Sequence, residues 1–146
     1  MQNNPEIENI IEQAVKIAKD KKHEYVLTEH LLLSLIRHDP FKSTLDKFGV
    51  EVSLLDSELE LYLDSLTSIV TEVADFMPKK TNAMERIFNR ANVQAMFTGR
   101  RVITTADLYL SIMAETNSHA HYFLLKYGVK KQEFIDFWQK RSEEHT

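Results

Sequence analysis

Apolar residues recur at helical spacing along most of the chain, and residues that start or stop helices separate the runs. In the first run, Ile7, Ile10 and Ala14 share one face of a helix. Asn4 is a suitable N-cap for this helix, and Pro5 costs nothing at its first position because the amide it lacks would have no partner there. The pattern therefore predicts a helix that begins at Pro5 and buries one apolar face.

Seven further helices follow from the same reasoning, and the pattern indicates no strand. In the first half, Thr28 is expected to cap a second helix that Pro40 ends, Gly49 to stop a third, and Ser53 to cap a fourth. In the second half, helices are expected over residues 81–98, stopped by Gly99, over 105–115, over 118–127, stopped by Gly128, and over 131–140.

The second half of the chain repeats the first. A shift of 77 residues places Ala14 on Ala91, Thr28 on Thr105 and Ser34 on Ser111, and a shift of 79 places Leu45 on Leu124 and Gly49 on Gly128. Matches at one offset that changes once, in a loop, indicate a tandem duplication. We therefore expect one all-α domain over residues 1–146. Two four-helix units, residues 5–69 and 81–140, are joined by a linker at 70–80 and pack with pseudo-two-fold symmetry as one bundle.

Composition excludes several classes of site. The chain has no cysteine, which excludes disulfides and thiolate metal sites, and its three glycines are isolated, which excludes a glycine-rich phosphate loop. No serine lies in the nucleophile elbow of hydrolases. The N-terminal residues lack the features of a secretion signal, and the longest apolar run is too short to span a membrane. We expect a cytoplasmic, non-catalytic protein without a cofactor.

Charge is unevenly distributed, although the net charge is only −4. Residues 51–75 contain seven acidic and no basic side chains, whereas residues 79–101 contain six basic and one acidic. Two interpretations stay open: solvated helix faces of opposite sign, or a bipolar surface that orients a partner. Arg100 and Arg101 would be the phosphate contacts of a nucleic-acid-binding protein, but the net charge argues against that class.

Histidine is the residue type that comes nearest to a metal site. His23 and His30, with Glu24 and Glu29, flank a short predicted turn and are weak candidates for a zinc ion. No pair of histidines four residues apart on a helix fixes the ligand geometry, so we expect no metal.

Segment 23–35, HEYVLTEHLLLSL, resembles the H-E-x-x-T-x-E-H-L-L-L-x-L stretch of the Clp N-terminal repeat domain, which receives substrates and adaptors in front of the ATPase rings of Clp unfoldases. Residues 81–91, with Met84, Ile87 and Phe88, look like the start of that domain's second repeat. The resemblance covers nearly the whole chain and is closest to the ClpA type. It implies an interaction module that docks a ClpS-like adaptor or protein substrates for Clp ATPase and protease machinery, with neither nucleic acid nor membrane as partner.

The same resemblance implies which residues form the adaptor-binding surface: Glu24, Glu29, Thr81 and Arg90, with His23 and Arg86 as an additional rim. We expect this surface to be solvent-accessible, so that charge reversal at Glu24 or Glu29 weakens binding and leaves stability intact. ClpC-like relatives carry a glutamate in each repeat, associated with recognition of phosphorylated arginine. Ala106 stands at the second position here, which argues against such a two-site receptor. The alternative is a free-standing accessory protein that modulates Clp protease or competes for its adaptor.

Overall fold

The computed structural model describes the backbone of residues 4–127 and 129–144 and the side chains of residues 4–127 and 129–141. Its helices and strands are α1 (Pro5–Asp20), β1 (Tyr25–Val26), α2 (Thr28–Arg37), α3 (Asp39–Phe48), α4 (Val52–Asp64), β2 (Lys79–Lys80), α5 (Asn82–Phe97), α6 (Thr105–Met113), α7 (His119–Lys126) and α8 (Lys131–Glu144). The predicted all-α class is confirmed, with eight helices in the described part of the chain.

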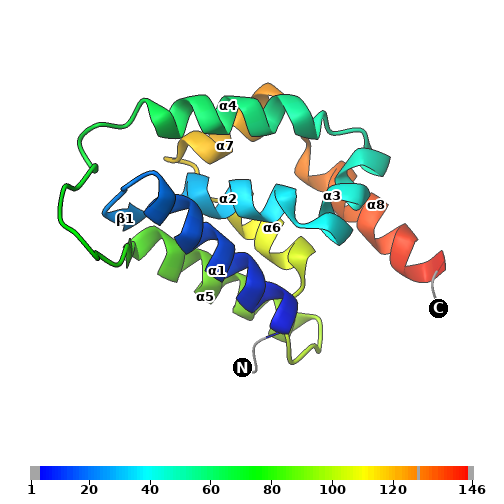
Figure 1. The fold of residues 1–146 in the computed structure, drawn as a ribbon. Coiled ribbons are helices and arrows are strands. Elements are labelled where there is room, and N and C mark those ends of the chain that lie inside the picture. The colour runs from blue at the N-terminus through cyan, green and yellow to red at the C-terminus, as the bar shows by residue number, and fades with distance from the viewer. Residues whose placement is uncertain (1–3, 128, 145–146) are drawn as a thin grey trace.

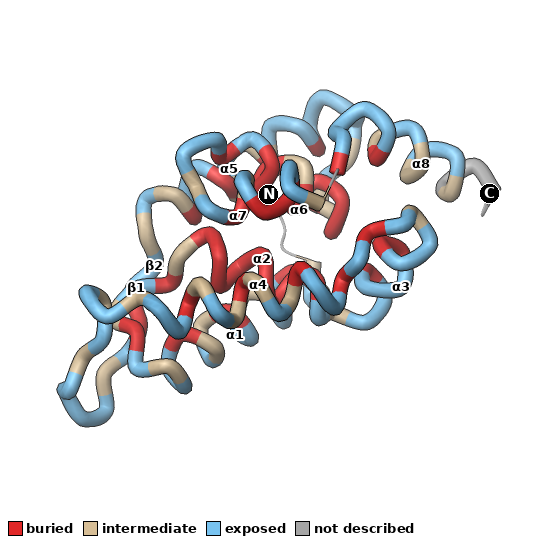
Figure 2. The backbone as a smooth tube through the Cα atoms, turned by 90° about the horizontal axis from the view of Figure 1, so that it is seen from above, coloured by how far each residue is buried: buried red, intermediate tan, exposed pale blue. Residues whose placement is uncertain are grey.

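The helices form three layers, and the middle layer is a pair of helices (Figure 1). Helices α1 and α5 make one outer layer, α4 and α7 the other, and α2 and α6 lie between them, while α3 and α8 close one end. The middle layer is the most buried, because the buried residues concentrate on α2 and α6 (Figure 2). Leu31, Leu35, Leu108 and Ile112 on these two helices are fully buried.

Helix starts agree with the sequence in part. The Asn4 side chain accepts a hydrogen bond from the Glu6 amide at 2.9 Å, as predicted for an N-cap. The caps predicted at Thr28 and Ser53 are wrong, because α2 begins one residue and α4 two residues earlier than expected, with Leu27 and Glu51 at the cap positions. The predicted stop at Gly49 is confirmed by its left-handed φ of 104°; the one predicted at Gly128 lies outside the described residues.

The tandem repeat is visible in matched hydrogen bonds. The Ser34 hydroxyl on α2 donates to the carbonyl oxygen of Ile10 on α1 at 2.6 Å. The Ser111 hydroxyl on α6 donates to the carbonyl oxygen of Ile87 on α5, also at 2.6 Å. Both pairs are related by the 77-residue shift found in the sequence, so each repeat packs its first two helices with the same buried serine contact.

Two short strands are an addition to the predicted fold. β1 and β2 pair in parallel, with Tyr25 opposite Lys79 and Val26 opposite Lys80. The Glu24 amide also donates to the Ile69 carbonyl oxygen at 2.7 Å, and the Thr71 amide donates to the Lys22 carbonyl oxygen at 2.9 Å. The sequence shows no alternation of apolar and polar residues here, because only two residues pair on each strand. These bonds attach the linker and the start of the second repeat to the turn after α1.

Helices able to cross a membrane, judged by length and apolar character, are absent from the described chain.

Candidate functional site

The turn between α1 and α2 contains a buried pair of histidines. Nδ1 of His23 lies 2.9 Å from Nε2 of His30, and Nδ1 of His30 accepts a hydrogen bond from the Leu27 amide at 2.8 Å. His30 therefore carries its proton on Nε2 and donates it to His23. Burial, followed by the nearby His23 and Lys21, lowers the pKa of His30 to about 3. Burial and Lys21 also lower the pKa of His23.

These contacts correct the expectation that His23 lies at the rim of the docking surface, and they bear on its weak candidacy as a metal ligand. Only 2% of its surface is exposed, so it is not a rim residue of a docking surface. As a metal candidate it is already bonded to His30 through one ring nitrogen, and the described residues contain no group of three or more potential metal ligands. The pair instead caps α2, because His30 satisfies the Leu27 amide at the start of that helix.

Glu29, predicted to be an accessible docking residue, is buried, with 5% of its surface exposed. Its Oε2 accepts a hydrogen bond at 2.9 Å from the amide of Ala120, in the first turn of α7. The expectation that Glu29 is solvent-accessible is therefore wrong. Its carboxylate satisfies a free amide at the N-terminus of α7, where the helix dipole also favours negative charge. This contact joins the two repeats, and the Glu29 charge adds to burial in raising the pKa of Tyr62.

Arg86 and Arg90 lie on α5 and bind one carboxylate between them. Arg86 Nε donates to Glu115 Oε1 at 3.1 Å, and Arg90 Nη2 donates to Glu115 Oε2 at 2.7 Å. Only 7% of the surface of Glu115 is exposed. Arg90 therefore holds the end of α6 against α5, which limits its availability to a partner.

Glu24 and Thr81 remain at the surface, at opposite ends of the short parallel strand pair. Glu24 directly precedes β1 and is half-buried, and its carboxylate has no hydrogen-bond or ion-pair partner among the described residues. Its carbonyl oxygen accepts from the Lys79 amide at 2.9 Å. Thr81 directly follows β2, and its hydroxyl donates to the carbonyl oxygen of Val26 at 2.9 Å. Of the predicted set, these two residues remain at the surface, one before β1 and the other after β2.

A groove of about 380 Å³ is lined by Thr81 and by residues of α5 that follow it. Its walls are apolar at Ile11, Met84, Phe88 and Ile103 and polar at Lys80, Thr81, Asn82, Glu85 and Asn92. We call Glu24, Thr81 and this groove the corner surface. Its mixture of apolar walls and a few polar groups is typical of sites that bind a polypeptide side chain.

Sequence reasoning missed most of the groove because its residues come from α1, α5 and the segment before α6. Met84 and Phe88 are four residues apart and share one face of α5. That spacing was a signal, but it does not distinguish a groove wall from a core face. Only the folded chain shows that Phe88 is half-buried and shares a groove with Ile11 of α1.

The fold and the corner surface define a helical repeat domain with a partly apolar groove beside α5. The chain matches the model of the Clp repeat (R) N-terminal domain over residues 3–127. It therefore belongs to the Clp N-terminal repeat family.

A ClpA homolog protein of Fuscovulum blasticum is 30% identical over 132 residues, which are 90% of this chain and 17% of that protein. The chain thus spans about one-sixth of this relative. The fold is similar to that of the Hsp104 N-terminal domain from Candida albicans, with a TM-score of 0.79, 12% identity, and coverage of 94% of this chain and 89% of that one. It is also similar to a ClpV N-domain in complex with a VipB peptide, with a TM-score of 0.64, 16% identity, and coverage of 88% and 79%.

Proposed function

We propose that this chain is a non-catalytic, cytoplasmic interaction module of a ClpA-like ATP-dependent unfoldase. In this role the corner surface docks a ClpS-like adaptor or a protein substrate for unfolding and proteolysis. The observation that carries the proposal is the groove beside α5, which is lined by Thr81, together with the unpaired carboxylate of Glu24 at the start of the strand pair that leads to Thr81.

The chemistry of the corner surface supports binding of a polypeptide. The half-buried Phe88 and Ile11 side chains offer apolar contact to an anchoring side chain, while Lys80 and Glu85 place both signs of charge on the groove walls. Buried apolar anchors supply most of the affinity in such interfaces, and charges at the rim direct encounter and orientation.

Membership of the Clp repeat family supports the same function. The ClpV N-domain has been solved with a VipB peptide, which supports peptide binding by a domain of this fold. The ClpA homolog at 30% identity supports the choice of a ClpA-like unfoldase and hence of a ClpS-like adaptor.

The test is calorimetric titration of the chain with a purified ClpS-like adaptor. We expect Glu24→Lys and Phe88→Ala each to weaken binding by about tenfold or more, because one reverses the unpaired charge and the other removes the apolar wall. The control is Glu133→Lys, which makes the same charge reversal on the exposed face of α8. Unchanged adaptor affinity in both corner variants, with normal thermal melts, would contradict the proposal.

A further inference from the structure

Three large apolar side chains lie exposed at the end of α5. Val93, Met96 and Phe97 are 52%, 65% and 85% exposed. Their spacing of three and four residues places them next to one another on the outside of the helix. Arg101 follows in the next loop and is exposed, with no hydrogen-bond or ion-pair partner among the described residues. We call these four residues the α5 patch; its character is apolar and basic.

The equivalent surface of the first repeat is charged and solvated. The 77-residue shift places Lys16, Lys19 and Asp20 of α1 on the three apolar residues of the α5 patch. All three are exposed, and Lys16 pairs with Asp20 at 2.9 Å. The fold therefore does not require apolar residues at these positions. Adjacent apolar side chains that are exposed without serving the fold mark a surface that contacts another molecule.

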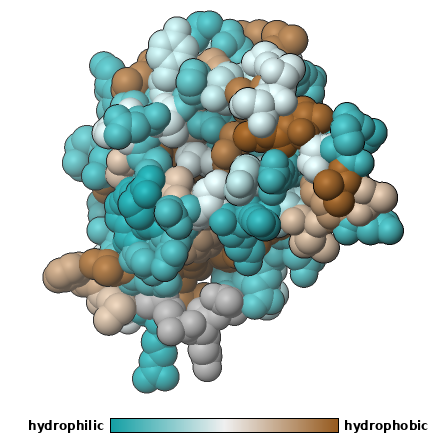
Figure 3. Space-filling model, turned by 90° about the vertical axis from the view of Figure 1, so that its left-hand side faces the viewer, coloured by the Kyte–Doolittle hydropathy of each residue, from teal (hydrophilic) through white to brown (hydrophobic). Residues whose placement is uncertain are grey.

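A patch of opposite charge lies in the linker. Val73 and Met77 are each 66% exposed. Glu72 and Asp75 between and beside them are also exposed, and neither carboxylate has a hydrogen-bond or ion-pair partner in the described part of the chain. Figure 3, which views the molecule from the linker side, shows hydrophobic residues at the surface among hydrophilic ones. We call these four residues the linker patch; its character is apolar and acidic.

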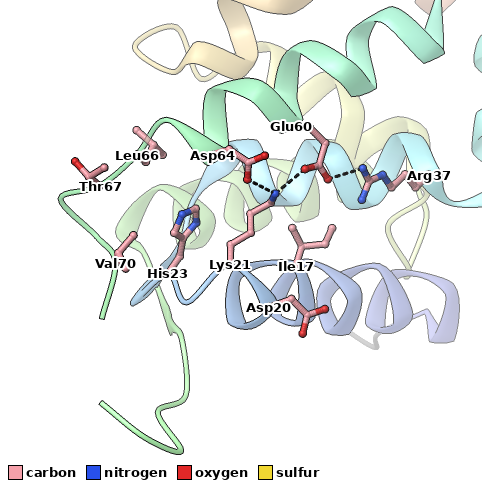
Figure 4. Close-up of a pocket in the computed structure, with 10 residues that line it drawn as sticks. All are labelled: Ile17, Asp20, Lys21, His23, Arg37, Glu60, Asp64, Leu66, Thr67 and Val70. Atoms are coloured by element: carbon pink, nitrogen blue, oxygen red, sulfur yellow. Dashed lines mark hydrogen bonds and ion pairs between the residues drawn. The ribbon is translucent and has the colours of Figure 1, made fainter. Parts of the chain in front are cut away.

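The acidic residues closest to the start of the linker are already neutralised. Figure 4 shows this region, where Nζ of Lys21 contacts carboxylate oxygens of Glu60 and Asp64, each at 2.6 Å. The linker is held here as well, because Val70 pairs with His23 in an antiparallel bridge. The negative charge that is available to a partner therefore lies beyond Val70, in the linker patch.

The two patches lie too far apart to meet within one chain. The linker patch precedes α5, the α5 patch lies at the far end of that helix, and 16 helical residues span about 24 Å. Figure 1 shows the linker and the end of α5 at opposite ends of the outer layer that α1 and α5 form.

We propose that the α5 patch of one copy of this chain binds the linker patch of a second copy. The apolar side chains of the two patches bury one another, and Arg101 faces the carboxylates of Glu72 and Asp75. A second copy is the occupant because its linker patch complements the α5 patch in both charge and apolar character. The contact joins two different surfaces, so a pair keeps one free patch at each end and adds further copies.

The test is sedimentation velocity of the chain from about 10 μM to about 1 mM, because a contact between two small patches belongs to the weak class of interfaces. We expect the average mass to rise with concentration and to pass that of a dimer. Phe97→Asp, which installs the residue of the first repeat, should weaken association by about tenfold. The matched control is Leu61→Asp, since Leu61 is 72% exposed on α4 and lies in neither patch. It should leave association unchanged.

A charge exchange tests which patches meet. Arg101→Glu should weaken association by about fivefold, and so should the double variant Glu72→Lys, Asp75→Lys. An equimolar mixture of the two should recover the association of the parent, because the reversed α5 patch of one variant meets the reversed linker patch of the other. All the substituted positions are exposed, so we expect unchanged thermal melts.

Three outcomes would overturn the proposal. They are a constant monomer mass up to the highest concentration, equal weakening by Phe97→Asp and Leu61→Asp, and no recovery in the mixture of charge variants. The residues of the two patches do not line the groove of the corner surface. Adaptor titrations of the same variants therefore report on the proposed function separately.

Discussion

The two repeats cap their second helices, α2 and α6, with different pairs of side chains. In the first repeat, His30 accepts a hydrogen bond from the Leu27 amide at 2.8 Å and is hydrogen-bonded to His23. In the second repeat, Asp107 accepts a hydrogen bond from the Thr104 amide at 2.7 Å and forms an ion pair with the guanidinium of Arg100. The 77-residue shift places Arg100 on His23 and Asp107 on His30. A neutral pair and an ion pair therefore occupy equivalent places and cap equivalent helices.

This difference shows that the repeat conserves the geometry of the cap and leaves its charge free to vary. Asp107 is 4% exposed and His30 is fully buried, so neither is available to a partner. The consequence is a difference in pH dependence between the two repeats. Protonation of the histidine pair breaks its internal hydrogen bonding, while the second repeat contains no histidine at the equivalent positions.

The largest effect we expect is a loss of stability in mild acid. His30 has its pKa lowered from the ordinary 6.5 to about 3 in the folded chain, so the unfolded state binds its proton first as the pH falls. Stability from this group is complete above pH 6.5 and is lost as the pH falls towards 3. We expect the free energy of unfolding to fall by about 3 kcal/mol between about pH 6.5 and 4, measured by urea denaturation at a series of pH values.

The control transplants the second repeat's pair into the first, as the double variant His23→Arg, His30→Asp. Whatever its absolute stability, this variant should lack the fall between about pH 6.5 and 5, because no buried histidine remains to bind a proton there. An identical pH profile in the parent and the double variant would show that the histidine pair is not the acid-sensitive group.

A smaller effect is expected where the first helix of each repeat ends. Lys22 follows α1 with a φ of 60°, and Gly99 follows α5 with a φ of 75°, again at equivalent positions. The left-handed conformation costs a residue with a side chain about 1–2 kcal/mol, while glycine loses about 0.5–1 kcal/mol of chain entropy on folding. We expect Lys22→Gly to stabilise the chain by about 0.5–1 kcal/mol in chemical denaturation.

The reciprocal variant Gly99→Lys should destabilise the chain by a similar amount. No atom lies within 4 Å of the position that its Cβ would take, so the cost comes from the backbone alone. A loss of stability in Lys22→Gly would contradict the equivalence of the two helix ends.

The duplication explains why so much of the fold could be predicted. Helical spacing and the 77-residue shift together gave the eight helices and the repeat, because each apolar face recurs in both halves. The two-residue strands could not be predicted, since their pairing depends on where the linker lies against the turn after α1.

The candidate site was harder to predict because its residues act across long distances in the chain. Glu29 was expected to be an accessible docking residue, yet it caps α7 through Ala120, 91 residues away. Arg90 likewise binds Glu115 on the neighbouring segment. A family motif marks such residues, but it does not separate those that contact a partner from those that hold the repeats together.

Two glutamates of the same motif provide the most direct test of the account. Glu24→Gln and Glu29→Gln make the same chemical change at an accessible position and at a buried one. Adaptor affinity by calorimetry and the free energy of unfolding are measured on both variants. We expect Glu24→Gln to weaken adaptor binding with no change in stability, and Glu29→Gln to cost about 1–3 kcal/mol of stability with adaptor affinity retained. The reverse pattern, in which Glu29→Gln abolishes binding in a stably folded chain and Glu24→Gln has no effect, would contradict it.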